Sequence, residues 1–216
     1  MEINMELKGK VINFLGDSVT GGCKVKDPAM VFHQIIARKL ECTANVYGAG
    51  GSCFSRETTE EEAKNWPPSF CDRVEEMDPN ADVNVVFGCQ NDYSHGTAPI
   101  GTPDDRTPET FYGACHYLIK AILEKYPCKP LIFMTPVHYQ AEMLENEHGR
   151  VFKDYIDIVR EVCEMYAIPV CDLFANSGIV PMLESQRPLL IPDGDHPNDL
   201  GHEIIASRFI GFVSTL

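Results

Sequence analysis

Long hydrophobic runs are missing from this 216-residue sequence, and none approaches the ~20 apolar residues that a membrane-spanning helix requires. The first ten residues, MEINMELKGK, mix acidic and basic side chains and lack the apolar stretch and small-residue cleavage site of a secretory signal. Linkers, repeats and low-complexity segments are also absent. We therefore expect a cytoplasmic protein with no membrane insertion, folded as a single domain over residues 1–216.

Basic side chains are scarce, with 18 Lys+Arg against 32 Asp+Glu and a net charge of −14. A surface of that sign repels phosphate backbones and anionic lipids. We therefore expect neither nucleic acid nor a membrane surface as a partner, while the sequence leaves the oligomeric state open.

The nine cysteines include no pair at CxxC spacing, which argues against a zinc ribbon and against a thioredoxin-like redox pair. An odd number cannot be fully paired in disulfides. Most of them lie in apolar segments, as Cys163 and Cys171 do, where a free thiol packs as a small hydrophobic group. We interpret them as reduced structural thiols, which are typical of cytoplasmic proteins.

Short β-branched runs alternate with longer segments of helical spacing. The expected buried strands cover residues 11–15, 43–47, 82–87, 131–135 and 168–173, and the expected helices cover about 28–40, 69–77, 108–125, 151–166 and 199–213. Thr107 and Pro108 are expected to cap and begin the third helix. This alternation predicts parallel βαβ units, and hence a three-layer α/β/α sandwich around a parallel sheet of about five strands.

Polar residues follow the expected strands, where ligands bind in open parallel sheets. After the first strand, Ser18 in GDSVTGG is either an exposed nucleophile or a helix N-cap. After the second, the glycines of GAGGS either bring backbone N–H groups close to a ligand or form only a tight turn. After the third, Asn91 in GCQNDY is either a side-chain donor or a turn residue.

Asp193-Gly194-Asp195-His196 stands just before the last expected helix. A carboxylate three residues before a histidine, with a glycine between them, can bind one imidazole nitrogen and leave the other free. The remaining histidines have no comparable setting, and those at positions 33, 116 and 202 are interpreted as helix residues.

Together the four segments resemble the signature blocks of the SGNH hydrolases, the family also named after its GDSL motif. GDSV at 16–19 matches the first block, the Gly51 turn the second, Asn91-Asp92 the third and Asp193-x-x-His196 the last. Val19 replaces the leucine of the motif name. Cys89 takes the place of a glycine that usually precedes the asparagine by two residues, and we interpret it as a small residue facing the sheet and not as a second nucleophile.

The resemblance implies a flavodoxin-like fold and a serine esterase or acylhydrolase. Ser18 would attack an acyl carbonyl, His196 would accept the Ser18 proton as general base, and Asp193 would orient His196. The GxSxG elbow of the α/β-hydrolases, which share this order of triad residues, is absent here.

The resemblance also implies an oxyanion hole. Its donors would be the backbone N–H groups of Ser18 and Gly51 and the side-chain amide of Asn91, with Gly50 as the alternative to Gly51. It implies no metal ion and no organic cofactor.

Two hypotheses from other functional classes compete with the esterase hypothesis. A metal-dependent hydrolase would use Asp17, Asp92, Asp193, Asp195 and His196 as ligands, but no HExxH motif and no clustered His/Cys pattern supports it. A non-catalytic carbohydrate-binding protein of the same fold would not need the complete set of serine, glycine, asparagine, aspartate and histidine.

The substrate is expected to be a small-molecule or carbohydrate ester with a short acyl group, such as acetyl, on a polar alcohol. The segments 92–107 and 136–150 are expected as walls of the site, and neither 92–107 nor the stretch 139–150 offers many large apolar side chains for a lipid chain. The segment 176–192 is a third expected wall, and its apolar residues Leu183, Leu189, Leu190 and Ile191 either pack in the core or line a groove. The groove would favour the alternative, a lysophospholipase or thioesterase that acts on longer acyl chains.

Overall fold

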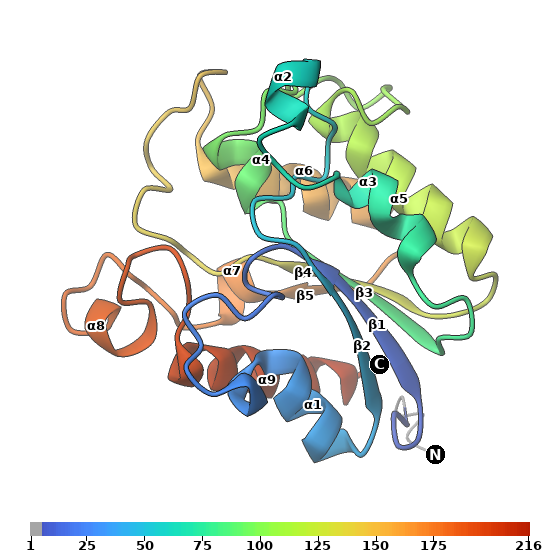
Figure 1. The fold of residues 1–216 in the computed structure, drawn as a ribbon, viewed down its shortest axis with the longest axis vertical. Coiled ribbons are helices and arrows are strands. Elements are labelled where there is room, and N and C mark those ends of the chain that lie inside the picture. Colours follow the sequence, from blue (N-terminus) through green and yellow to red (C-terminus); the bar gives the residue numbers. More distant parts are fainter. Residues whose placement is uncertain (1–5) are drawn as a thin grey trace.

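The computed structural model describes residues 6–216 and contains one five-stranded sheet (Figure 1). The strands are β1 (Val11–Gly16), β2 (Thr43–Gly48), β3 (Val83–Phe87), β4 (Leu131–Thr135) and β5 (Val170–Asp172). They lie in the order β2-β1-β3-β4-β5, and every neighbouring pair is parallel. The predicted parallel sheet of about five strands is therefore confirmed.

Helices cover both faces of the sheet. The longer ones are α1 (Phe32–Leu40), α5 (Phe111–Lys125), α6 (Phe152–Met165) and α9 (Asp199–Val213). The shorter ones are α2 (Glu60–Ala63), α3 (Phe70–Arg73), α4 (Gln90–Ser94), α7 (Leu173–Asn176), α8 (Arg187–Leu190) and the 3₁₀ turns η1 (Pro28–Met30) and η2 (Val74–Glu76). In Figure 1, α1 and α9 lie on one side of the sheet, and α3, α5 and α6 lie on the other.

The core lies in two layers, because successive side chains of a strand point to opposite faces of the sheet. Leu15, Val86 and Phe133 belong to the apolar cluster under α5 and α6. Their chain neighbours Phe14, Val85 and Ile132 belong to the cluster under α1 and α9. All residues of β3 and β4 are buried, which agrees with the mostly apolar sequences of these strands.

The expectation of a buried strand was wrong for β2. Its residues are exposed or half-buried, and Val46 is 39% exposed. The cause is its position at the edge of the sheet, where only β1 pairs with it.

The start of α5 also differs from the prediction. Thr110, and not Thr107, is the N-cap, and its hydroxyl accepts the Gly113 N–H at 3.1 Å. The N–H groups of Phe111 and Tyr112 donate to the carbonyls of Pro99 and Ile100, which holds the preceding segment as a loop. The expected helix over 69–77 is divided into α3 and η2.

Strand order reverses between β1 and β3, since the chain adds β2 on one side of β1 and the later strands on the other. A crevice at such a switch point is where open α/β sheets bind ligands. Among residues 6–216, no helix has both the length and the apolar character needed to cross a membrane. The expectation about a secretory signal involves residues 1–5, which lie outside the described residues.

Candidate active site

Ser18 lies in a tight turn directly beyond the end of β1. The Asp17 carboxylate accepts the Val19 N–H at 2.9 Å, and the Asp17 carbonyl accepts the Gly21 N–H at 2.9 Å. The Ser18 carbonyl accepts the N–H of Cys23 at 2.9 Å. These bonds fix the turn and leave the Ser18 side chain partly exposed at the carboxyl edge of the sheet.

The structure brings Ser18, His196 and Asp193 into one hydrogen-bonded line. Ser18 Oγ lies 3.0 Å from His196 Nε2, and His196 Nδ1 lies 3.1 Å from Asp193 Oδ2. The other Asp193 oxygen accepts the N–H groups of His196 at 2.7 Å and of Asp195 at 3.0 Å. Partial burial acts to raise the pKa of Asp193, but these donors outweigh it and lower the pKa, so the carboxylate is ionised at neutral pH.

A second carboxylate stands close to the same imidazole. Asp195 Oδ2 lies 3.4 Å from His196 Nδ1, and the other Asp195 oxygen accepts the side-chain amide of Gln90. Asp193 is the nearer of the two acids and its side chain is the less exposed, at 31% against 44%. The geometry therefore favours Asp193 as the partner that orients His196.

The glycine turn after β2 lies against Ser18. The Ser52 N–H donates to the Ala49 carbonyl at 3.2 Å, and Gly51 has φ +83°, as the third residue of a type II turn requires. A Cβ at Gly50 would lie 3.6 Å from Ser18 Cβ. Within residues 6–216, the N–H groups of Ser18, Gly50 and Gly51 donate to no protein acceptor, so all three are available to a ligand.

Asn91 comes from the first turn of α4, beyond the end of β3. Its side-chain Nδ2 donates to the Ser52 carbonyl at 3.0 Å. An asparagine amide carries two donor hydrogens, so this bond fixes the side chain and leaves one hydrogen for a ligand. The bond also joins Asn91 to the glycine turn.

Arg73 was not among the sequence-predicted site residues. It is 4% exposed, and its guanidinium donates to the carbonyls of Gly16 at 3.0 Å and Tyr47 at 2.8 Å and to Ser52 Oγ at 3.0 Å. It thereby ties the ends of β1 and β2 to the glycine turn. Burial lowers the pKa of this guanidinium.

The sequence does contain a signal for Arg73. In the expected helix over 69–77, it shares one face with Phe70, Val74 and Met77, which are all buried. A charged residue on an otherwise apolar helix face needs polar partners inside the fold. That signal predicts a buried arginine, but it does not identify the carbonyls that the guanidinium binds.

Asp17 and Asp92 are buried carboxylates near the site, and burial raises the pKa of each to about 6. Asp92 accepts the N–H groups of Phe54 at 2.8 Å and Ser55 at 2.9 Å, and the Ser55 hydroxyl at 2.6 Å. Both acids therefore bind backbone N–H groups. The acids of the alternative metal site do not gather into a ligand group among the described residues.

A cavity of about 530 Å³ borders the turn that carries His196. It is lined by Ser94, Tyr139, Gln140, Ala141, Met143, Leu144, Asp193, Gly194 and Asp195. Of the segments expected as walls, 136–150 contributes most of this lining and 92–107 contributes Ser94. In the third, Leu190 and Ile191 pack in the core, whereas Leu183 and Leu189 are exposed.

Several solved structures are similar to this one in fold. One with 31% sequence identity has a TM-score of 0.88, and the match covers 98% of this chain and 99% of that chain. A protein from Lactobacillus plantarum has 25% identity and a TM-score of 0.82, with 95% and 97% covered. The acetyl xylan esterase AlAXEase has 18% identity and a TM-score of 0.62, with 93% and 98% covered. No curated protein matches the chain.

A family model matches residues 14–204, from the middle of β1 into α9. The match includes the Ser18 turn, the glycine turn, Asn91 and the Asp193–His196 turn, and so confirms the resemblance inferred from those segments. Because it covers most of the chain, and because the sheet order agrees with it, this protein belongs to the GDSL-like lipase/acylhydrolase family of hydrolases.

Proposed function

We propose that this protein is a serine esterase that forms an acyl-enzyme on Ser18. The observation that carries the proposal is the line of hydrogen bonds from Ser18 Oγ through His196 to Asp193, at 3.0 and 3.1 Å. As Ser18 Oγ bonds to the ester carbonyl carbon, its proton passes to His196 Nε2. His196 then returns that proton to the departing alkoxide, and a water molecule, deprotonated by His196, releases the acid.

In this proposal, three donors stabilise the charge that develops on the carbonyl oxygen. They are the N–H groups of Ser18 and Gly51 and the side-chain amide of Asn91, and the unpaired N–H of Gly50 is the alternative to that of Gly51. Donors held in place before the reaction stabilise the transition state without the cost of reorganisation. The four bonds of Arg73 and the Asn91–Ser52 bond supply this rigidity.

The proposed substrate is an ester of a short acyl group, such as acetyl, with a polar or carbohydrate alcohol. Support comes from the polar groups at the cavity beside His196, which include the Ser94 hydroxyl, the Gln140 amide and two carboxylates. The fold is shared with an acetyl xylan esterase. All nine cysteines are free, which suits a reducing compartment, and we propose the cytoplasm as the place of the reaction.

A specific observation favours the second candidate, an acylhydrolase for longer chains. Met143 and Leu144 line the same cavity and are 73% and 66% exposed. Exposed apolar side chains at the mouth of a site can cover part of an acyl chain, and each buried CH₂ would contribute ~0.8 kcal/mol. The two candidates therefore differ in how activity depends on chain length.

A series of p-nitrophenyl esters from acetate to decanoate distinguishes the candidates. We expect kcat/KM to be highest from acetate to butyrate and to fall steeply by octanoate. A maximum at octanoate or beyond would replace the short-acyl proposal with the long-chain one. In that case the double variant M143S/L144S should lose the long-chain preference, while L183S, at an exposed leucine outside the cavity lining, should keep it.

A further inference from the structure

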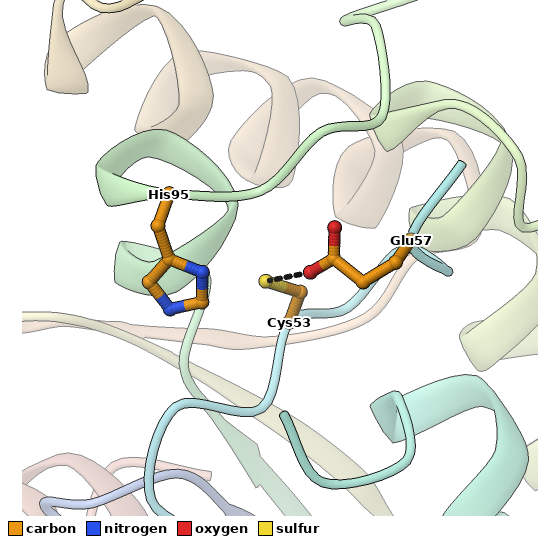
Figure 2. A group of neighbouring side chains, drawn as sticks. All are labelled: Cys53, Glu57 and His95. Carbon is orange, nitrogen blue, oxygen red and sulfur yellow. Dashed lines mark hydrogen bonds between the residues drawn. The ribbon is translucent and has the colours of Figure 1, made fainter. Parts of the chain in front are cut away.

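Three side chains with metal-binding atoms meet beside the glycine turn and α4 (Figure 2). Cys53 and Glu57 come from the loop that follows the turn, and His95 ends α4. The Cys53 sulfur, a Glu57 carboxylate oxygen and a His95 ring nitrogen all lie within 4.8 Å of one another. We call these three residues the thiol cluster.

His95 has polar atoms that the protein does not satisfy. Among residues 6–216, neither of its ring nitrogens has a hydrogen-bond partner, although both are shielded from solvent. Each nitrogen of a neutral imidazole that carries no hydrogen can donate a lone pair to a metal ion. Buried polar groups are usually hydrogen-bonded, so an imidazole without a protein partner is a candidate metal ligand.

Cys53 and Glu57 make an unusual pair. The buried Cys53 thiol donates to a Glu57 carboxylate oxygen across 3.6 Å, and the other Glu57 oxygen accepts the Thr97 N–H at 3.1 Å and its hydroxyl at 2.6 Å. A cysteine binds a metal ion as the thiolate, after the ion displaces the thiol proton.

We propose that Cys53, Glu57 and His95 bind one Zn²⁺ ion. Zinc in proteins takes thiolate, imidazole and carboxylate ligands in tetrahedral geometry, and bond lengths near 2.0–2.3 Å place the donor atoms about 3.3–3.8 Å apart. The 3.6 Å between the Cys53 sulfur and Glu57 fits this range, and a His95 ring nitrogen lies within 4.8 Å of both atoms.

Charge balance supports a divalent cation at this position. When zinc binds, the S–H bond of Cys53 breaks, an S–Zn bond forms and the proton passes to solvent. The thiolate and the carboxylate then compensate the two positive charges of the ion, and the neutral imidazole adds no charge. The site is then neutral overall, so the bound ion leaves no net charge buried.

A route to the site and space for a fourth ligand are also present. A cavity of about 160 Å³ borders Cys53 and Glu57. That volume holds several water molecules, since one water occupies about 30 Å³ in the liquid. We therefore assign the fourth position to water.

The ion would cross-link the two segments that carry the proposed oxyanion donors. Cys53 is two residues from Gly51, and His95 is four residues from Asn91. Trp66 joins the same region, because its ring contacts Gly51 and stacks on His95 with 3.8 Å between ring centroids. The effect on catalysis rests on the proposed esterase function, but the binding of zinc does not.

The test measures metal binding to the full chain after reduction and treatment with a chelator. Competition with a chromophoric chelator gives the zinc stoichiometry and Kd, and Co²⁺ substitution reports a sulfur ligand through its thiolate charge-transfer band. The variants are C53S, E57Q and H95Q. Matched controls are C163S and H116Q, which change a buried cysteine and a buried histidine outside the thiol cluster.

We expect one zinc per wild-type chain, with the affinity reduced ~100-fold in C53S and H95Q and ~10-fold or more in E57Q. Both controls should bind like the wild type. At a hundredfold excess of zinc over Kd, Tm should rise by about 5–10 °C in the wild type and not in H95Q. If C53S does not fold, H95Q and E57Q still decide the question.

Two results would overturn the site. One is the absence of a thiolate–cobalt band in the wild type, and the other is equal zinc affinity in H95Q and in H116Q. Repeating the titration with S18A separates this inference from the esterase proposal, because Ser18 is not a zinc ligand. Zinc binding without ester hydrolysis would reject only the esterase, and hydrolysis without zinc binding would reject only the metal site.

Discussion

The triad of Ser18, His196 and Asp193 and the thiol cluster lie on the two sides of the same glycine turn, but their polar atoms are satisfied to different degrees. In the triad, each functional atom has a partner, from Ser18 Oγ to both Asp193 oxygens. In the thiol cluster, both His95 ring nitrogens lack one among the described residues. The triad is complete as a hydrogen-bonded unit, whereas the thiol cluster leaves the His95 imidazole without a protein partner among the described residues.

The two regions share α4 and the loop 49–53. Asn91 lies in α4, and His95 directly follows the last residue of that helix. The Ser52 carbonyl accepts the Asn91 amide, and its neighbour Cys53 belongs to the thiol cluster. A proposed catalytic donor and a proposed metal ligand therefore depend on the same short helix. Variants on either side test whether the two regions act separately.

The largest expected effect is the loss of esterase activity in S18A, with the fold intact because Ser18 is partly exposed and not in the core. A fluorophosphonate should label Ser18 in the wild type, as read by mass spectrometry, and should not label S18A. C53S should still be labelled at Ser18. Retention of a tenth of the wild-type kcat in S18A would remove Ser18 from the mechanism, and loss of the Ser18 label in a folded C53S would show that the two regions do not act separately.

The two carboxylates at His196 should differ sharply. D193N should lower kcat by ~10²–10⁴, because an amide can fix the wrong imidazole tautomer and cannot stabilise the imidazolium. D195N should lower it less than ~10-fold, because Asp195 is farther from Nδ1, at 3.4 Å against 3.1 Å. Steady-state kinetics with p-nitrophenyl acetate measure both. A larger loss in D195N would make Asp195 the orienting acid.

N91A should lower kcat by ~10²–10³, the usual loss when one oxyanion donor is removed. KM should change less, since the amide acts on charge that develops in the transition state. N91A should also retain zinc binding, because Asn91 is not in the thiol cluster. A change confined to KM would mean that Asn91 only positions the substrate.

Much of the fold was predictable because it depends on local periodicity. The strand over 131–135 and the helix over 199–213 have the predicted bounds. The short helices α2, α4, α7 and α8 were not expected, since helices of four or five residues carry too little periodic signal. The exposure of β2 depends on sheet order, which the sequence of one strand does not contain.

The site was predictable where its residues follow strands. Ser18 and Asn91 lie beyond the ends of β1 and β3, and parallel strands bring those ends to one edge. The sequence does not indicate a role for His95. Its neighbours Cys53 and Trp66 are brought to it by loops of irregular conformation, which periodicity does not predict. The contacts of Arg73 were hidden for the same reason.

Asp17, which lies beneath the triad, should give the wild type a pH-dependent stability that D17N lacks. Burial raises the Asp17 pKa from 3.8 to about 6, so the folded chain keeps a proton that the unfolded chain releases between those values. The free energy of unfolding therefore falls as pH rises through that range. The side-chain oxygen of D17N can still accept the Val19 N–H. From pH ~4 to ~7, the free energy of unfolding of D17N should therefore rise by about 3 kcal/mol relative to that of the wild type.

Urea unfolding at several pH values measures this difference between D17N and the wild type. D193N is the control of opposite sign, because the Asp193 pKa is lowered in the folded chain. Its carboxylate stabilises the fold above the unfolded pKa and loses that effect as pH falls through the folded one. The free energy of unfolding of D193N should therefore fall relative to the wild type as pH rises to about 4, and the difference should stay constant above that pH. A difference between D17N and the wild type that does not change with pH would mean that Asp17 is not held protonated by burial.

The smallest expected effect is at Cys89, which precedes α4 and so supports both regions. Its backbone has φ +92°, where side chains cause strain, and its own side chain is 1% exposed. C89G and C89A both remove the buried sulfur, but only C89G relieves the strain. C89G should therefore be more stable than C89A by about 1–2 kcal/mol, as measured by urea unfolding. Equal stability would show that the surrounding packing, and not the backbone conformation of Cys89, fixes the start of α4.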